Sequence, residues 1–314
     1  MNNIGKLEKN FISIVVYVQN HEKYIEEFIH KVTSIIDNNF EKSEFIFVND
    51  FSTDNTISII KEKFRSYTDK ACTIINLSYE HKVERAMIAG QDVAIGDFVY
   101  EFDTPIIDYN IEKVMEIYHR CLTGYDIVSA SPDTNKLTSK IFYKVFKKYS
   151  TNNITLQSER FRVLSRRGIN RIKNVSQTIP YRKAVYFNCG LKATTISFES
   201  SKDKLNNINN STTIRDIDFA ADNLLFFTNI GWKISALMSA IMISFSVCIG
   251  VYTFITWLVN ENVISGWTTI MMFLSIVFSV LFVLITIIIK YLSLILFINI
   301  TKQDYVFESV DKIK

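Results

Sequence analysis

The chain has 314 residues, of which 48% are hydrophobic, and its formal net charge at neutral pH is +3. This length and apolar content exclude one small soluble domain and indicate a globular part joined to segments that are buried elsewhere. The mild charge, without a stripe of Lys and Arg interleaved with aromatic residues, argues against nucleic acid as a partner.

The first 122 residues alternate between short apolar runs and amphipathic stretches. β-branched and aromatic runs of strand length are followed by helical patterns, and the strands are apolar on both faces. This alternation predicts an α/β domain with a mostly parallel sheet covered by helices on both faces. The expected strands are 11–18, 44–50, 72–77 and 97–103, and the expected helices are 23–36, 57–67, 84–95 and 111–122.

Acidic side chains follow three of these strands. Glu22 comes after the first strand, Asp50 and Asp54 after the second, and Asp103 after the fourth. Because ligands of parallel sheets bind beyond the carboxyl ends of the strands, we expect these carboxylates to converge on a binding site. Asp54 has a second interpretation as a helix N-cap, since Asx side chains accept hydrogen bonds from first-turn amides.

Two long apolar segments lie in the C-terminal third. Residues 234–259 and 267–289 contain no charged residue. Each segment exceeds the ~20 residues that cross a bilayer. They therefore predict two transmembrane helices.

Basic residues flank this pair of segments. Arg215 and Lys233 precede the first segment, and Lys290 and Lys302 follow the second. The positive-inside tendency places both flanks in the cytoplasm. The N-terminal residues lack the apolar stretch of a signal peptide, which agrees with a cytoplasmic N-terminal domain.

The order of several short motifs resembles a known family. The motifs are IVVYVQNHE (14–22), FVNDFSTDNT (47–56), AMIAG (86–90), GDFVYEFD (96–103) and FRVLSRR (161–167), followed by the two apolar segments. In this order they resemble the family-2 glycosyltransferases with a Rossmann-like GT-A fold. Within that family the chain is most similar to bacterial polyprenyl-phosphate glycosyltransferases related to dolichol-phosphate mannose synthase.

The resemblance implies a binding site for a nucleoside-diphosphate sugar. In the family, the loop after the first strand and a pair of aspartates after the second hold the nucleobase and ribose. Asp50 matches the second aspartate, and Asn49 stands at the first. Asn20 and Glu22 lie in the first loop, and Lys82 lies one residue before the family's lysine.

The DxD signature of the family is degenerate here. It supplies two carboxylates that hold Mg²⁺ or Mn²⁺ against the diphosphate, because a hard cation on oxygen ligands stabilises the departing charge. Asp103 falls on the first acid and Pro105 on the second. The resemblance thus implies that Asp103 lies near the diphosphate or a remaining metal ion. It also implies that Arg162, in the family's Phe-Arg position, faces the acceptor phosphate.

Two explanations of the proline remain open. In one, the transferase works without the standard metal site, using Asp103 with water ligands or Glu101 on the same face of the strand. Arg160, Arg162 or Lys82 then neutralises the diphosphate directly. In the other, the chain is a pseudoenzyme that keeps the fold and the membrane segments but has lost turnover.

The resemblance also implies an organisation and an activity. Residues 1–230 are expected to form a cytoplasmic GT-A domain, 231–290 a two-helix transmembrane anchor, and 291–314 an interfacial helix and tail. The expected enzyme is a multi-pass protein of the bacterial cell membrane, with both termini cytoplasmic. It moves a hexose from a nucleoside-diphosphate sugar to a polyprenyl phosphate for cell-envelope polysaccharide, and the family allows a homo-oligomer. The alternative is an inactive member that binds a glycolipid or a partner transferase.

Overall fold

The structure is a computed structural model, and the chain divides into two compact units. It describes residues 7–67, 70–133, 159–175, 189–199 and 305–313, positions 182, 185 and 186, and single helical positions between 237 and 295. One unit comprises Met1–Lys147, Ile154–Asp216 and Gln303–Lys314, and the other comprises Lys148–Asn153 and Ile217–Lys302. All the strands named below belong to the first unit.

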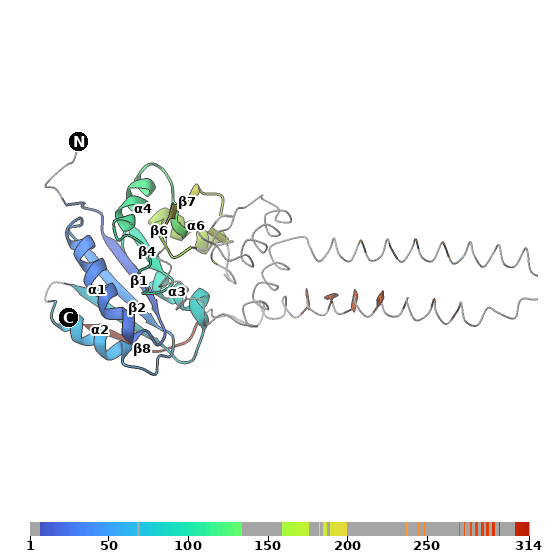
Figure 1. Cartoon of the computed structure of the whole chain (residues 1–314), viewed down its shortest axis with the longest axis horizontal. Helices are drawn as coiled ribbons and strands as arrows, with labels where there is room; N and C mark the ends of the chain where they lie inside the picture. Colours follow the sequence, from blue (N-terminus) through green and yellow to red (C-terminus); the bar gives the residue numbers. More distant parts are fainter. Residues whose placement is uncertain are drawn as a thin grey trace, which may run out of the picture. The chain divides into compact units, whose positions relative to one another are not determined.

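An eight-stranded sheet forms the centre of the first unit (Figure 1). Its order is β7-β5-β6-β4-β1-β2-β3-β8, and β4, β1, β2 and β3 run parallel to one another. This confirms the predicted α/β sheet, whereas the antiparallel strands β6 and β8 were not predicted. The strands are β1 (Ile12–Val18), β2 (Ser43–Asn49), β3 (Ala71–Leu77), β4 (Phe98–Phe102), β5 (Ile127–Pro132), β6 (Phe161–Ser165), β7 (Ala193–Phe198) and β8 (Phe307–Ile313).

Helices cover both faces of the sheet. Ile14 and Phe47 face a core shared with α1, α2 and α4, while Val15 and Val48 face α3. The period-2 alternation of side chains along each strand produces this division. Figure 1 shows α1 and α2 side by side across the strands. The helices are α1 (Glu22–Asp37), α2 (Thr56–Arg65), α3 (Lys82–Val93), α4 (Lys113–Leu122) and α6 (Arg166–Val175).

The C-terminal strand β8 lies in the last part of 291–314, where a tail was expected, and the interfacial helix expected before it stays a prediction. Residues 307–313 pair antiparallel with β3, so that Ile313 lies opposite Cys72. The amide of Ser78 also donates a hydrogen bond to the carbonyl of Val306, at 3.1 Å. The apolar residues of FESVDKI are Phe307, Val310 and Ile313, which are three apart, so the sequence lacks the period-2 alternation that predicts a strand. Its three charged residues suit an exposed sheet edge.

The expected transmembrane segments lie largely outside the described residues. Among the residues that the structure describes, no helix is long and apolar enough to span a bilayer. Scattered positions within 234–259 and 267–289 are described as helical, and some of them, such as Leu237 and Ile270, carry exposed side chains. The two spans therefore stay a prediction.

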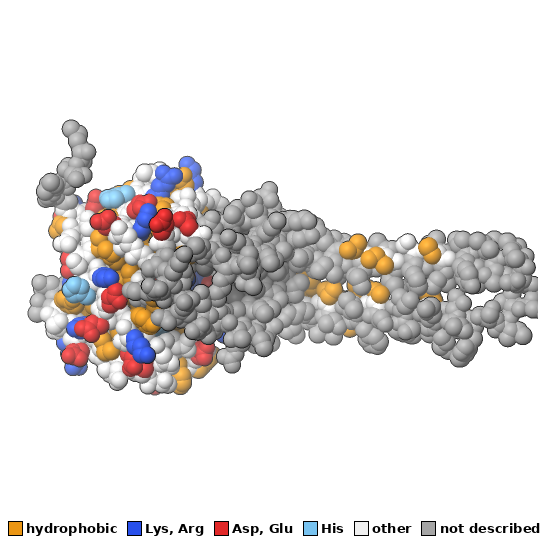
Figure 2. Space-filling view, in the orientation of Figure 1, with side chains coloured by type: hydrophobic (Ala, Val, Ile, Leu, Met, Phe, Trp, Pro, Cys, Tyr) orange, Lys and Arg blue, Asp and Glu red, His pale blue; other side chains and the backbone are white. Residues whose placement is uncertain are grey.

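Charged side chains do not separate by sign on the face of the sheet unit seen in Figure 2. Acidic and basic groups are interspersed there with apolar ones. Surface charge therefore does not mark a binding site on this face.

Close packing of α3 on the sheet generates a first prediction. A Cβ added at Gly90 would overlap the Val15 side chain and lie 2.9 Å from Val48 Cγ2. We expect Gly90→Ala to lower the free energy of unfolding by about 1–3 kcal/mol, because overpacking outweighs the gain in helix propensity. Labelling of the buried Cys72 thiol in increasing denaturant measures this loss, with the exposed Cys248 replaced by Ser.

The matched control is Gly168→Ala in α6. A Cβ there meets its nearest atom, the Asp126 carbonyl oxygen, at 3.2 Å, so the change should be smaller. Equal stability of Gly90→Ala and the unchanged chain would contradict the packing described for α3.

Candidate active site

The parallel strands bring the predicted loops to one edge of the sheet. β1, β2, β3 and β4 are adjacent and parallel, so their carboxyl ends lie at the same edge. Residues 19–22, 50–55, 78–81 and 103–110 follow these ends. The edge holds two groups of carboxylates, one after β1 and β2 and one at the end of β4.

Asp50 is buried and receives hydrogen bonds on both oxygens. The amide of His81 donates to Oδ1 at 2.7 Å, and the amide of Lys82 and the hydroxyl of Tyr17 donate to Oδ2 at 2.8 and 3.0 Å. Burial raises the pKa of Asp50, and these bonds oppose that rise. Asp50 thereby ties β2 to β1 and to the start of α3, and its predicted contact with the nucleoside stays a prediction.

Glu22 and Asn20 hold the loop after β1 against the loop after β2. Glu22 Oε2 accepts the Asn55 amide at 3.2 Å, and Asn20 Oδ1 accepts the Thr53 amide at 2.8 Å. Asp54 accepts the amides of Glu22 and Thr56, both at 3.0 Å. The N-cap residue of α2 is Asn55 rather than Asp54, although the Asp54 carboxylate does bind a first-turn amide.

Asn49 and Lys82 occupy the same rim. Asn49 donates to Asn76 at 2.9 Å and accepts the Ser52 amide at 3.0 Å. Lys82 has a φ of 65° and an exposed side chain at the first residue of α3. An exposed amine at this edge is available to an anionic ligand.

At the end of β4, two arginines bridge the same two carboxylates. Arg162 donates from Nη1 to Glu101 at 2.9 Å and from Nη2 to Asp103 at 2.5 Å. Arg182 does the same from its own Nη1 and Nη2, at 2.8 and 2.7 Å. Register explains part of this arrangement, since Arg162 on β6 pairs directly with Glu101 on β4. We call these four residues the arginine–carboxylate ring.

Further polar groups surround the ring. The second oxygen of Glu101, Oε1, accepts the Tyr186 hydroxyl at 3.0 Å and the Gln91 amide. The Nε atoms of Arg182 and Arg162 each lie 3.1 Å from another carboxylate, Glu84 and Glu159 respectively. Both arginine side chains are fully buried, whereas the Asp103 side chain is 15% exposed. Asp103 is thus the member of the ring that reaches the sheet edge.

Electrostatics keep the ring charged. Burial alone would lower the pKa of Arg162, but Asp103, Glu159 and Glu101 outweigh burial and hold that pKa above its ordinary value. Burial raises the pKa of Tyr186, and Glu101 raises it further, so the phenol keeps its proton and donates it. Buried ions in a low-dielectric interior persist only when they are paired in this way.

This donor set does not fit a divalent cation. Mg²⁺ and Mn²⁺ need oxygen ligands, yet both Asp103 oxygens accept guanidinium N–H groups. Pro105 is buried and carries no ligand, and Asp108 accepts a bond from Arg160 at 3.1 Å. Across the described ranges, no three His, Cys, Asp or Glu side chains gather in a way that could hold a metal ion.

Arg162 contacts protein carboxylates in the structure, and its expected place on an acceptor phosphate stays a prediction. Its side chain is fully buried between Glu101 and Asp103, where it contacts protein carboxylates. Arg160, the other arginine of this motif, pairs with Asp108. Among the residues that the structure describes, both guanidinium groups of this motif are thus paired with carboxylates.

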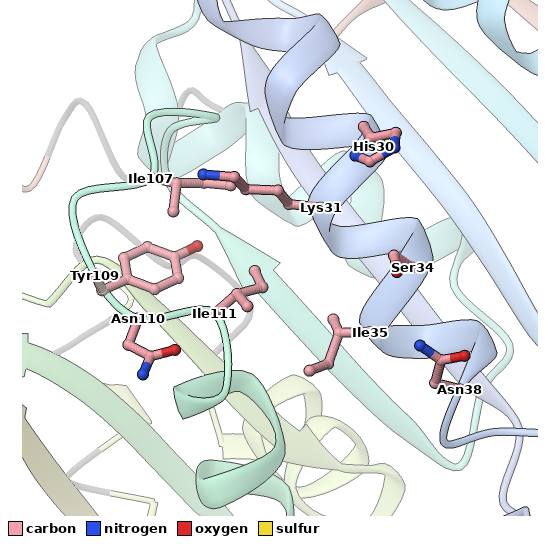
Figure 3. Close-up of a pocket in the computed structure, with 9 residues that line it drawn as sticks. All are labelled: His30, Lys31, Ser34, Ile35, Asn38, Ile107, Tyr109, Asn110 and Ile111. Carbon is pink, nitrogen blue, oxygen red and sulfur yellow. The ribbon is translucent and has the colours of Figure 1, made fainter.

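A separate hollow lies beside α1. Its volume is about 440 Å³, and it is shared between the second half of α1 and the loop before α4 (Figure 3). The buried Tyr109 hydroxyl is directed toward α1 and has no hydrogen-bond partner among the described residues. The hollow contains no member of the arginine–carboxylate ring. Its lining residues are His30, Lys31, Ser34, Ile35, Asn38, Ile107, Tyr109, Asn110 and Ile111.

Comparison with known proteins assigns this domain. Residues 13–186 match the family model for Glycosyl transferase family 2, which is more than half of the 314-residue chain. The chain therefore belongs to glycosyl transferase family 2, as the motif order predicted.

Two relatives and one solved structure are informative. An uncharacterized glycosyltransferase of Bacillus subtilis is 28% identical over 193 residues, which cover 59% of this chain and 59% of that protein. The bactoprenol glucosyl transferase of Shigella phage SfV is 24% identical over 267 residues, which cover 83% and 86%. The Mycobacterium tuberculosis glucosyl-3-phosphoglycerate synthase, solved with Mn²⁺ and UDP-glucose, has a TM-score of 0.50 at 12% identity and covers 69% of this chain and 77% of that one. This last likeness shows the GT-A-type fold.

Several residues around Glu101 were not predicted from the sequence as parts of a site. Glu84 and Gln91 are seven residues apart on α3, which places them on the same helix face, and that face is otherwise apolar. Two polar residues at this spacing on a buried face indicate a buried polar network. Arg182 and Tyr186 carry no such local pattern.

The ring generates a stability prediction. Arg162→Met leaves Glu101 and Asp103 with one guanidinium instead of two. It also takes a guanidinium away from the buried Glu159. We expect the free energy of unfolding to fall by about 3–5 kcal/mol, because buried carboxylates lose a pairing cation. Labelling of Cys72 in denaturant measures it.

The matched control is Arg167→Met, whose exposed guanidinium pairs with the buried Asp126. Asp126 keeps the hydrogen bond from the Ser165 hydroxyl, so the loss should be smaller. Equal losses for both variants would remove the special role of the ring.

His21, in the loop after β1, generates a pH prediction. Burial lowers the pKa of His21 to about 4, although Asp54 partly opposes this shift, and its Nδ1 accepts the Gln19 amide at 2.9 Å. The folded pKa lies below the ordinary value of about 6.5, so the unfolded chain binds the proton first as pH falls. Stability that is present above about pH 6.5 should fall by up to about 3 kcal/mol by pH 4.

The same labelling measurement, repeated from pH 7.5 to 4, tests this expectation. His21→Gln should flatten the dependence. His30→Gln, at an exposed histidine of α1, should keep it. A dependence that is unchanged in His21→Gln would place the titrating group elsewhere.

Proposed function

We propose that the chain is a membrane-anchored glycosyltransferase that moves a hexose from a nucleoside-diphosphate sugar to a polyprenyl phosphate at the cytoplasmic leaflet. The observation that carries this proposal is the extent of the match to the phage bactoprenol glucosyl transferase. That match covers 83% of the chain, while only 12 residues precede the family domain. It therefore extends well past residue 186, toward the apolar segments.

Exposed aliphatic side chains support a membrane location. Eight described helical positions between 237 and 295 carry Leu or Ile side chains that are at least 40% exposed. Apolar side chains gathered in this number favour a lipid or protein environment over water. These positions are Leu237, Ile241, Ile270, Leu281, Ile285, Ile288, Leu292 and Ile295.

The return of the chain to the sheet supports two spans. The segment that leaves the sheet unit after Asp216 rejoins it at Gln303, and β8 then pairs with β3. A segment that leaves and re-enters one folded unit crosses a bilayer an even number of times. The basic flanks then favour the cytoplasm for the whole sheet unit.

The acceptor chemistry requires little from the protein. A phosphate oxygen of the acceptor attacks the anomeric carbon as the nucleoside diphosphate leaves. Because a phosphate is already ionised at neutral pH, the reaction proceeds without a strong general base. We assign the nucleoside to the rim around Asn20, Asn49 and Asp50, and the diphosphate to the edge between Lys82 and Asp103.

One observation favours the second candidate, a family member without turnover. Glu101 and Asp103 are both engaged by buried arginines, and Pro105 stands where a further acid is expected. Such a chain would bind a nucleotide or a glycolipid without making product. The two candidates differ in one measurable outcome, which is the formation of glycosylated lipid.

The test is an assay of the purified full chain in lipid nanodiscs. It uses a panel of nucleotide sugars with a short-chain polyprenyl phosphate, and mass spectrometry detects the product. We expect product from the unchanged chain and a loss of about 100-fold in Asp103→Asn, on the scale of removing one electrostatic group from an active site.

The matched control is Asp37→Asn, at an exposed carboxylate at the end of α1. It should retain full activity. Nucleotide binding without product across the whole panel would favour the second candidate. Unchanged activity in Asp103→Asn would move the chemistry away from this edge.

A further inference from the structure

The ring contains a carboxylate pair with the spacing of a metal motif. Glu101 lies on β4, Asp103 directly follows its end, and one residue separates them, so both side chains lie on the same side and share the same two arginines. This is the spacing of the two acids in DxD, displaced by two residues toward the strand. The cations between these two carboxylates are guanidinium groups, and each of the two arginines donates one Nη to each carboxylate.

Two guanidinium groups carry the formal charge of one divalent ion. Arg162 and Arg182 stay protonated, and their planar forks match carboxylate geometry. They come from β6 and from a position near Tyr186, which contributes its own hydroxyl to Glu101. A metal ion could bind Asp103 only beside or in place of a guanidinium already 2.5–2.7 Å from each oxygen.

The loop after β4 supplies no replacement ligand. Pro105, Ile106 and Ile107 are buried, and the next acid, Asp108, is buried against Arg160. The chain therefore turns apolar side chains inward where a metal motif would continue with an acid. The loss of the second acid and the presence of the two buried arginines are separate observations, and both argue against a metal ion at this site.

We propose that Arg162 and Arg182 replace the divalent cation in this chain. The two arginines cancel the negative charge of Asp103, so the nucleoside diphosphate binds at this sheet edge without a metal ion. Both are positioning residues, because their buried guanidinium groups act through Asp103. The proposal deepens the proposed function, since it takes the nucleoside diphosphate as ligand. Its prediction for metal binding is independent of any nucleotide.

The first experiment uses Mn²⁺ alone as the probe. Electron paramagnetic resonance of free Mn²⁺, titrated with the purified full chain, should show no site that depends on Asp103 in the unchanged protein. Arg182→Gln withdraws one cation from Glu101 and Asp103 and should bind Mn²⁺ at least tenfold more tightly. The matched control is Arg167→Gln, which removes a guanidinium from Asp126 and should behave as the unchanged chain.

A second pair of variants separates the effect of the missing acid at Pro105 from the effect of the two arginines. Pro105→Asp restores the missing acid but leaves both arginines on Asp103, so it should gain little Mn²⁺ affinity. The double variant Pro105→Asp with Arg182→Gln should gain the most. If Pro105→Asp alone acquires the full Mn²⁺ affinity of the double variant, the arginines do not exclude the metal and the proposal fails.

The third experiment measures UDP and GDP binding by calorimetry with EDTA or with added Mn²⁺. We expect the Kd of the unchanged chain to change less than twofold between the two conditions. A nucleotide Kd that rises more than tenfold in EDTA would overturn the proposal. So would an Mn²⁺ site in the unchanged chain that is lost in Asp103→Asn. Should Arg182→Gln fail to fold, as judged by rapid Cys72 labelling, the EDTA comparison on the unchanged chain decides alone.

The two proposals fail in distinguishable ways. If neither nucleotide binds under any condition, the proposed function fails, while the Mn²⁺ titrations still decide the role of the arginines. If nucleotide binds only with Mn²⁺, the proposed function survives and the replacement of the metal does not.

Discussion

Everything at the carboxyl edge of this sheet depends on the pairing of buried charge at the end of β4. Glu101 and Asp103 lie where water is largely excluded, and an isolated carboxylate there would be very unfavourable. Arg162 and Arg182 remove that cost, each by bridging both acids. Segments that are 60 to 80 residues apart in sequence are therefore held to one geometry by four ions. The site exists only when the whole sheet unit is assembled.

The two ends of the edge hold their carboxylates by different means. Asp50 is fixed by backbone amides and a phenol, which carry no net charge. Asp103 is fixed by guanidinium groups, which cancel its charge. An anionic ligand that extends along this edge thus meets one acid that is held by uncharged donors, and then one acid that is paired with two cations. The paired end suits the part of a ligand that carries the most negative charge.

Much of the fold was accessible from sequence because apolar runs of strand length are strong local signals. The strands β1 to β4 and the helices between them were predicted within a few residues. The family match confirmed the family that the order of the motifs predicted. β8 was assigned to a tail, since FESVDKI lacks the period-2 alternation of a strand and its partner β3 lies more than 200 residues away. Arg182 was not predicted because its role depends on contacts with Glu84, Glu101 and Asp103, which are distant in sequence.

The pairing of β8 with β3 has a consequence for how this protein is made. The ribosome delivers β3 before the apolar segments, but its partner strand emerges only after those segments have been synthesised. Until then the outer edge of β3 presents unpaired backbone groups, which are prone to wrong association. Completion of the domain is thereby coupled to delivery of the segments that precede β8. A nascent chain stalled before residue 305 would carry an open sheet and should be a preferred substrate for chaperones and proteases.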